Sequence, residues 1–398
     1  MITITDKRKC CGCTACQQIC PKHSIEMQED EEGFLYPVVN VETCVDCGLC
    51  EKVCMAHNSY EAYDKVPEAY NCKTKEESLR ALSSSGGVFP IIASQVISDG
   101  GVVIGARFMS DWSVAHTVAE TFEEERHFCG SKYVQSNLTD IFQKTQLLLA
   151  SGRKVLFSGT PCQVAGLHHF LRKEYENLFT IDMVCHSIPS PKVWKMYLSQ
   201  TTKGEKATKV TFRNKTEGWH SYGLEIKVGN CSVDKGSNTE NLYMRGFLED
   251  LFTRPSCSQC MARNYTSHSD IMLADAWGVD KYHPEHDDNK GLSQVLIITQ
   301  KGAKLFEKVK NGGSIDVWRI PYKEVEDRSL HLPITSSTPP HPYREYFFRN
   351  FEKQSLQSLI AFCLSENDKR VKKLMLMKRM GRLIGLDKIY RIWKLVRK

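Results

Sequence analysis

The sequence predicts an α+β protein with three parts: a small cysteine-rich N-terminal module, a larger α/β body, and a basic helical C-terminal tail. Three observations lead to this prediction. Two copies of one cysteine pattern lie within the first 60 residues. Strand-like and helix-like segments then alternate through the body, which argues for a partly parallel sheet. Residues 369–398 hold twelve Lys and Arg against a single acid, Asp387.

The composition excludes several classes of protein. The chain has 398 residues, of which 41% are hydrophobic and 25% are charged, as in soluble globular proteins of two or three domains. No run approaches the roughly 18 apolar residues of a membrane-spanning helix, and the N-terminus lacks a signal-peptide core. We therefore expect a cytoplasmic protein. In that compartment, many of the 17 cysteines are expected to bind metal or carry redox chemistry rather than form disulfides.

The charge is unevenly distributed along the chain. The formal net charge is +6, whereas residues 369–398 alone carry +11 (12 − 1), so the first 368 residues carry −5 (6 − 11). An acidic body does not suit nucleic acid, and we expect no nucleic-acid partner.

The expected domains are a module over residues 1–62, two parts of the body over 76–158 and 159–345, and a tail over 346–398. A hairpin is expected around Gly33, and a polar connector over 60–77. Within the body, helices are expected over 86–98, 138–151, 163–174 and 192–200, and strands over 101–108, 154–158 and 179–184.

The cysteines of the module repeat with one spacing. The pattern Cys-x2-Cys-x2-Cys-x3-Cys occurs twice, 34 residues apart. This pattern is typical of ferredoxin-like modules with two 4Fe-4S clusters, because three closely spaced cysteines hold one cluster and the fourth reaches the other. Two zinc sites are the alternative, which two copies in register disfavour. The spacing assigns one cluster to Cys10, Cys13, Cys16 and Cys54, and the second to Cys44, Cys47, Cys50 and Cys20.

Two residues depart from the repeat. Met55 stands where the second copy often has a proline, which removes no ligand. Cys11 is an additional thiol inside the first copy. Since its neighbours are already assigned as ligands, we interpret it as a packed free cysteine.

Four cysteines of the body form a third candidate site. Cys162 is expected at a helix N-terminus, which would lower the pKa of its thiol, and Cys185 ends the next strand. If the strands are parallel, both thiols lie at the carboxyl edge of one sheet. Cys257 and Cys260 add a Cys-x2-Cys pair. Spacing alone leaves an iron-sulfur cluster, a zinc ion and a redox dithiol open.

Several short motifs over residues 78–302 carry a resemblance to a known family. They are Ser84-Ser85-Gly86-Gly87, Gly130-Ser131-Lys132-Tyr133, Gly159-Thr160-Pro161-Cys162-Gln163, Val184-Cys185, Cys257-Ser258-Gln259-Cys260 and Ser269-Asp270-Ile271 with Asp275-Ala276-Trp277-Gly278. The body resembles the beta subunits of the coenzyme F420 (deazaflavin) reducing hydrogenases and dehydrogenases.

That resemblance implies two more cofactors. A third 4Fe-4S cluster would be held by Cys162, Cys185, Cys257 and Cys260. FAD would lie near Ser85, Gly86, Gly87 and Lys132. On the residues alone, an ordinary serine helix cap with two flexible glycines is the favoured interpretation of segment 83–87, and the resemblance shifts the preference to the flavin site.

The resemblance implies an iron-sulfur flavoprotein oxidoreductase, which passes electrons between 4Fe-4S clusters and FAD. The expected partners are an electron donor or acceptor protein, such as ferredoxin or a partner oxidoreductase subunit, and a small-molecule acceptor. That acceptor would be a deazaflavin-like coenzyme or an intermediate of surface-polysaccharide synthesis. His220 is the candidate proton donor beside the flavin, with an ordinary loop histidine as the alternative.

Two other functions stay open at this point. One is a non-catalytic electron-transfer subunit, and the other is a structural or redox-sensing protein with zinc in the body. The residues therefore leave open whether the chain is an enzyme.

The tail interleaves basic and apolar residues, among them Trp393. This pattern is typical of a helix that lies in a membrane interface, which would place the protein peripherally on the inner membrane face. A terminal helix docked on the acidic body is the equal alternative.

Overall fold

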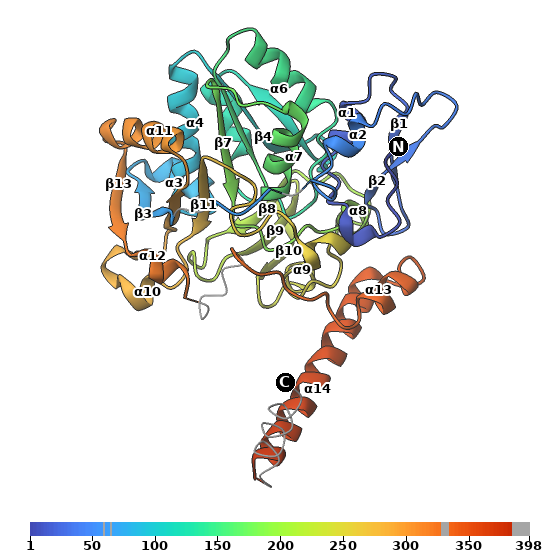
Figure 1. The fold of residues 1–398 in the computed structure, drawn as a ribbon. Coiled ribbons are helices and arrows are strands. Elements are labelled where there is room, and N and C mark those ends of the chain that lie inside the picture. Colours follow the sequence, from blue (N-terminus) through green and yellow to red (C-terminus); the bar gives the residue numbers. More distant parts are fainter. Residues whose placement is uncertain (59, 64–65, 328–333, 384–398) are drawn as a thin grey trace.

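The computed structural model describes residues 1–58, 60–63, 66–327 and 334–383 (Figure 1). It confirms the predicted fold class: an N-terminal ferredoxin-like module lies against an α/β body, and a long helix follows. Among these residues, no helix has the length and apolar character needed to cross a membrane.

The module consists of a hairpin and short helices. β1 (Ile25–Glu29) pairs antiparallel with β2 (Leu35–Val39), which confirms the predicted hairpin. α1 (Ala15–Gln18) and α2 (Leu49–Lys52) each begin after a residue with positive φ, and each contains the third cysteine of one copy of the repeat. A short 3-10 helix, η1 (Lys7–Lys9), precedes the first copy.

One mixed sheet of eight strands forms the centre of the body, in the order β13-β3-β12-β11-β7-β6-β4-β5. β4, β6, β7 and β11 run parallel to their neighbours within this group, which confirms the predicted parallel section. The strands are β3 (Glu68–Thr74), β4 (Val102–Phe108), β5 (Val114–Ala119), β6 (Val155–Gly159), β7 (Leu178–Met183), β11 (Ile271–Asp275), β12 (Ser293–Ile297) and β13 (Ile315–Ile320).

The predicted connector over 60–77 is wrong in its second half. β3 lies there, between β12 and β13, and pairs antiparallel with both. Its buried side chains include Ala69, Tyr70 and Cys72, so the segment is an inner strand of the sheet rather than a polar linker. Polar residues between those apolar positions concealed the strand from the sequence pattern.

Helices cover both faces of the sheet (Figure 1). On one face, α4 and α11 bury apolar side chains such as Ile92 and Phe306 against the strands. On the other face, α6 and α7 do the same with Phe142 and Leu167. The helices around this sheet are α3 (Glu77–Leu82), α4 (Val88–Ser98), α5 (Phe122–Glu125), η2 (Arg126–Phe128), α6 (Ile141–Ala150), α7 (Pro161–Leu171), α10 (Val279–Tyr282), η4 (Pro284–His286), α11 (Gln300–Asn311) and α12 (Tyr322–Val325), while α8 (Pro191–Thr201) belongs to the second core. The four helices predicted for the body correspond to α4, α6, α7 and α8.

A smaller sheet and a second core complete the body. The sheet has the order β10-β9-β8, and its core contains Trp194, Tyr243 and Phe347. α14 packs Leu359 and Cys363 into this core and then extends away from the body (Figure 1). The predicted helical character of the tail is confirmed as far as residue 383; residues 384–398 lie outside the described part. The remaining elements are β8 (Lys209–Asn214), β9 (Gly223–Val228), β10 (Cys231–Ser237), α9 (Leu242–Leu248), η3 (Pro255–Gln259), α13 (Arg344–Asn350) and α14 (Leu356–Leu383).

Candidate functional site

Four cysteines line a cavity of about 370 Å³ at the outer edge of the module. Three come from the second copy of the repeat and one from the first, which is the crossed grouping that the spacing assigns to one cluster. Cys47 is exposed, so this cavity lies at the surface. We call these residues the outer set: Cys20, Cys44, Cys47 and Cys50.

The other four module cysteines lie on the side that faces the body. We call them the inner set: Cys10, Cys13, Cys16 and Cys54. Burial, with Cys10 and Cys54 nearby, raises the pKa of Cys16 to about 12. Cys13 packs directly on α7, where a Cβ atom added at Gly166 would lie 2.7 Å from the Cys13 Cβ. A glycine at this position therefore lets the inner set approach the body.

The four body cysteines named by the sequence come together around one cavity of about 430 Å³. Cys162 lies in the first turn of α7, Cys185 follows β7, and Cys257 and Cys260 belong to the η3 segment. We call these four residues the body set. The cavity wall is otherwise mostly apolar, with Val184, Ile188 and Met272 among its residues. Four thiols around one cavity fit a 4Fe-4S cluster. Among the described residues, no three of these sulfur atoms lie within 4.8 Å of one another, so the set is wider than the arrangement that a single zinc ion needs.

The predicted lowering of the Cys162 pKa is wrong. The contact with Cys11 and burial raise the pKa of the Cys162 thiol, although the hydrogen bond with Thr160 and the charge of Arg254 lower it. Burial also raises the pKa of Cys185, and it raises that of Cys257 to about 12. Thiols of this kind become thiolate ligands when a metal displaces their protons.

Cys11 lies between the inner set and the body set. Its thiol is within hydrogen-bonding reach of both Cys13 and Cys162, and its Sγ is 3.4 Å from the Sδ of Met55. Its burial agrees with the interpretation as a packed cysteine. No local pattern indicated that it packs at the junction, by which we mean the contact between the module and the body.

Side chains that sequence reasoning missed hold this junction. Arg254 donates to the carbonyl oxygen of Cys10, and Gln18 Oε1 accepts from the backbone N–H of Phe142 at 2.8 Å. Arg344 forms an ion pair with Glu32. One signal was present for Arg254, because a cation three residues before the Cys-x2-Cys pair is well placed to act on its thiolates.

Two partly buried lysines lie near the segment predicted to approach a flavin. The Nζ of Lys132 donates to the carbonyl oxygens of Phe128 and Cys129, and burial lowers its pKa to about 7. Lys215 donates to the carbonyl oxygens of Arg80 and Lys290, and burial lowers its pKa to about 8. Among the described residues, neither ammonium forms an ion pair. These groups fit an anionic ligand such as a diphosphate.

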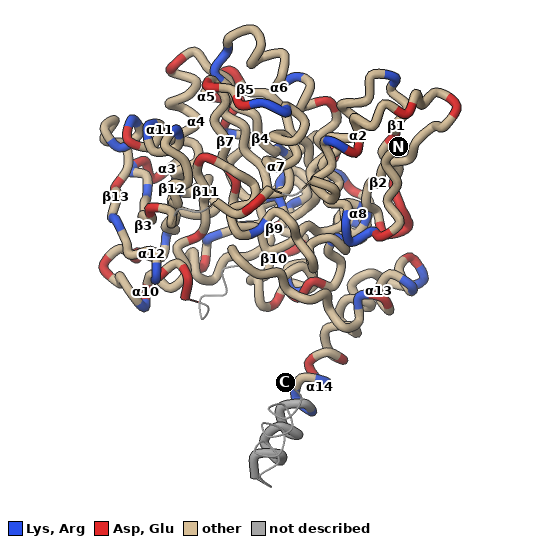
Figure 2. The backbone as a smooth tube through the Cα atoms, viewed as in Figure 1, with Lys and Arg blue, Asp and Glu red and all other residues tan. Residues whose placement is uncertain are grey.

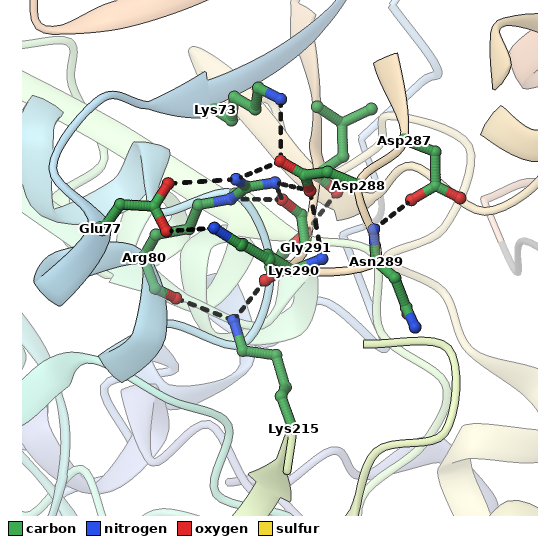
Figure 3. A network of polar contacts seen from close by, with 12 residues as sticks. Lys73, Glu77, Arg80, Lys215, Asp287, Asp288, Asn289, Lys290 and Gly291 are labelled. Atoms are coloured by element: carbon green, nitrogen blue, oxygen red, sulfur yellow. Dashed lines mark hydrogen bonds and ion pairs between the residues drawn. The ribbon is translucent and has the colours of Figure 1, made fainter. Parts of the chain in front are cut away.

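The loop that follows α10 is fixed beside this segment by a polar network (Figure 3). Arg80 is buried and binds Asp288 and the carbonyl oxygen of Gly291, while Lys73 donates to the same carboxylate. Burial opposes ionisation of Asp288, but the hydrogen bonds from Arg80 and Lys73 prevail and lower its pKa. The network thereby holds the loop against α3 and positions Lys215.

Two of the predicted flavin residues, Ser85 and Gly86, already form hydrogen bonds within the protein. Ser85 donates to the carbonyl oxygen of Leu292, and the N–H of Gly86 donates to Ser293 Oγ. A Cβ at Gly86 would lie 2.3 Å from a backbone oxygen, so this glycine permits close packing of the chain. Gly87 caps α4 with φ +78°. Ser85 and Gly86 thus shape the loop, while Lys132 contributes the charge.

A second ion pair and three aromatic rings border this region. Arg213 binds Asp275 at 2.9 Å, donates to the carbonyl oxygen of Ser84, and stacks on Tyr222. Trp219 and Trp277 stack with ring centroids 4.5 Å apart.

The structure places His220 beside these rings. Its Nε2 lies 2.6 Å from a carboxylate oxygen of Asp287, and its side chain is 34% exposed. This geometry fits either a proton donor held by a carboxylate or a surface ion pair, so the role of His220 stays a prediction.

The comparisons with known families agree with this division of the chain. Residues 152–322 match the family described as the C terminus of the coenzyme F420 hydrogenase/dehydrogenase beta subunit. Residues 9–58 match the 4Fe-4S dicluster domain. The chain is therefore an iron-sulfur protein of the electron-transfer class. The match over residues 152–322 confirms the resemblance to the F420 hydrogenase/dehydrogenase beta subunits for that part of the body.

Among solved structures, this chain is similar to one chain of the F420-reducing [NiFe] hydrogenase complex from Methanosarcina barkeri. The sequence identity is 16%, the TM-score is 0.46, and the match covers 79% of this chain and 92% of that chain. No curated protein matches this chain.

Proposed function

We propose that this chain is an iron-sulfur flavoprotein oxidoreductase, in which the module accepts electrons from a redox protein and the body acts on a diffusible acceptor. The outer and inner sets would each hold a 4Fe-4S cluster, and the body set would hold a third. FAD would bind near Lys132. When bound, clusters carry single electrons and a flavin exchanges them for a two-electron hydride.

One observation carries this proposal: the three cysteine sets form a continuous series from the surface into the body. Cys47 of the outer set is exposed, and Cys13 of the inner set packs against α7. That same helix contains Cys162 of the body set, and Cys11 fills the space between them. A zinc protein would have no reason to align three such sets.

The support for FAD lies in the charges around Ser84. Its hydroxyl is 2.7 Å from that of Ser131, and its carbonyl oxygen accepts from Arg213. Lys132 follows Ser131 directly. A flavin diphosphate would supply a negative charge to the two partly buried lysines, and the partly exposed indole of Trp277, which stacks on the buried Trp219, offers an apolar edge.

The acceptor belongs to one of two chemical classes. A deazaflavin-like coenzyme would follow the family, and an intermediate of surface-polysaccharide synthesis is the other candidate. The tail favours neither, but it fits a peripheral position on an anionic membrane. Binding of the full chain to vesicles rich in anionic lipid, abolished by removal of residues 369–398, would support that position.

The test is anaerobic purification of the full chain, with iron, acid-labile sulfide, zinc and flavin measured per chain. We expect about twelve irons and one FAD. About eight irons without flavin would reduce the proposal to the module alone. Zinc in the body set would exclude the relay, and about twelve irons without flavin would favour a non-catalytic electron-transfer subunit.

A further inference from the structure

Arg254 is a buried cation at the junction. Its side chain is fully enclosed, with the residue 1% exposed, although arginine is rarely buried without a charged partner. The guanidinium donates to the carbonyl oxygens of Cys10 and Leu35, both at 2.8 Å, and to Gln135 Oε1 at 3.1 Å. Its fourth contact is with the Sγ of Cys10 at 3.7 Å.

Nothing else in its surroundings neutralises this charge. Within the described part of the chain, no carboxylate lies at ion-pair distance from Arg254. The ring of Tyr36 lies 4.4 Å from the guanidinium carbon and that of Phe34 lies 5.3 Å away, and both attract a cation only weakly. Because arginine stays protonated, it cannot escape the cost of burial by losing its charge. A permanent negative charge close by would offset this cost.

The inner set and the body set are the groups in position to supply it. Arg254 contacts Cys10 of the inner set, and at the start of η3 it precedes Cys257 of the body set by three residues. A cluster with four thiolate ligands is an anionic group. Gln135 fixes the guanidinium from the body side, and its Nε2 donates to the carbonyl oxygen of Cys11 at 3.3 Å.

We infer that Arg254 is the counter-charge of the inner cluster and sets its reduction potential above that of the outer cluster. This inference rests on the proposed function. Reduction adds an electron to a cluster, and a buried cation that donates to a ligand sulfur stabilises the reduced state. Among the described residues, the outer set has no buried cation of this kind: the cations that line its cavity, Lys22 and the Met1 ammonium, lie at an open surface, where water screens charge. Arg254 is thus a positioning and tuning residue for the relay.

The test is a redox titration of the anaerobically purified full chain, with each cluster followed by electron paramagnetic resonance. The Cys47→Ser variant, altered only in the outer set, assigns the two module signals. In Arg254→Gln we expect the reduction equilibrium of the inner cluster to shift at least tenfold toward the oxidised form. This corresponds to about 59 mV for one electron. The outer cluster should keep its potential.

Two controls separate charge from structure. Arg254→Lys keeps a cation and should retain most of the potential. The double variant Glu32→Gln/Arg344→Gln neutralises another ion pair of the same junction and should leave both module potentials unchanged.

The other possible results either support or overturn the role of the Arg254 charge. An unchanged inner potential in Arg254→Gln, or an equal shift in the double variant, would overturn the inference. If Arg254→Gln loses the inner cluster, retention of that cluster in Arg254→Lys supports the role of the charge. Loss in both variants would assign a structural role instead. A body set without iron would contradict the proposed function, yet the inner potential would still be measurable.

Discussion

The two cysteine sets of the module have the same cysteine spacing but differ in burial and in the residues that surround them. The inner set is covered by the body, contacts Arg254, and lies beside Cys11. The outer set opens to the surface around the exposed Cys47, among apolar side chains that include Val41, 66% exposed, and Val45, 58% exposed.

This contrast shows that ligand spacing specifies a cluster but not its task. The surroundings of each set suit a different role. An apolar, accessible edge suits a transient encounter with a redox partner, and a buried charged junction suits electron transfer within the chain. The module also carries nine acidic and five basic residues over 1–58, a net charge of −4 (5 − 9), seen around β1 and β2 in Figure 2. A partner with a basic face would complement it.

The largest effect should come from removing one ligand of each set. Cys54→Ala and Cys47→Ala should each lose about four irons. Cys54→Ala should also lower the thermal midpoint more, because metal binding contributes to folding and the inner set lies in the junction. Iron analysis and calorimetry under anaerobic conditions measure both quantities. Equal losses of stability would show that the two sets do not differ as described.

The next effect tests the close approach of the inner set to α7. Gly166→Val should cost about 1–3 kcal/mol and weaken the inner cluster while sparing the outer one, because its Cβ would meet Cys13. Gly312→Ala, in a surface turn after α11, is the control and should change little. Preserved inner-cluster signals in Gly166→Val would show that the module can shift relative to α7 without loss of the inner cluster.

A smaller effect concerns Lys132, a partly buried lysine of the body whose charge, unlike that of Arg254, depends on pH. The Lys132 pKa is about 7 when folded and near 10.4 when unfolded, so the unfolded chain binds more protons between these values. Stability of the flavin-free chain should therefore rise with pH, by about 1 kcal/mol from pH 7 to 8.5 after allowance for solvent access. Denaturant unfolding of the flavin-free chain and of Lys132→Met measures it, and the variant should lack this rise. Bound FAD should suppress the rise, since an anion keeps the lysine charged.

The smallest effect on stability concerns the outer edge. Val45→Glu and Val45→Lys should each stay within about 0.5 kcal/mol of the parent. Electron transfer to a basic c-type cytochrome should slow a few-fold in Val45→Lys and not in Val45→Glu, with a steep dependence on salt. Val233→Lys, on β10, is the control. If the rate of electron transfer changed equally in all three variants, the outer edge would not be the docking face.

The sequence predicted the parts of the site that depend on local spacing. The eight module cysteines lie in two short segments, so their pattern alone proposes the crossed pairing that the cavity around Cys20 and Cys47 supports. The body set spans almost a hundred positions. Its convergence followed from parallel strands that end at one sheet edge, together with the family resemblance.

The parts that escaped prediction depend on tertiary contacts. Cys11 looked like a spare thiol because nothing local shows that α7 lies against it. Arg254 was not singled out, since its spacing to Cys257 is local but its burial against the module is not visible in a sequence. The raised pKa of Cys162 followed from the same packing, because the contact with Cys11 and burial are its main causes.

The contact between Arg254 and Cys10 joins residues 244 positions apart. At a synthesis rate of about 5–20 residues per second, the inner cysteines leave the ribosome about 10 to 50 s before the arginine that covers them. Cluster insertion into the module therefore has a limited interval during translation, after which docking of the body encloses the site. The junction that covers the inner set in the finished protein would thus favour insertion of the inner cluster before the body docks.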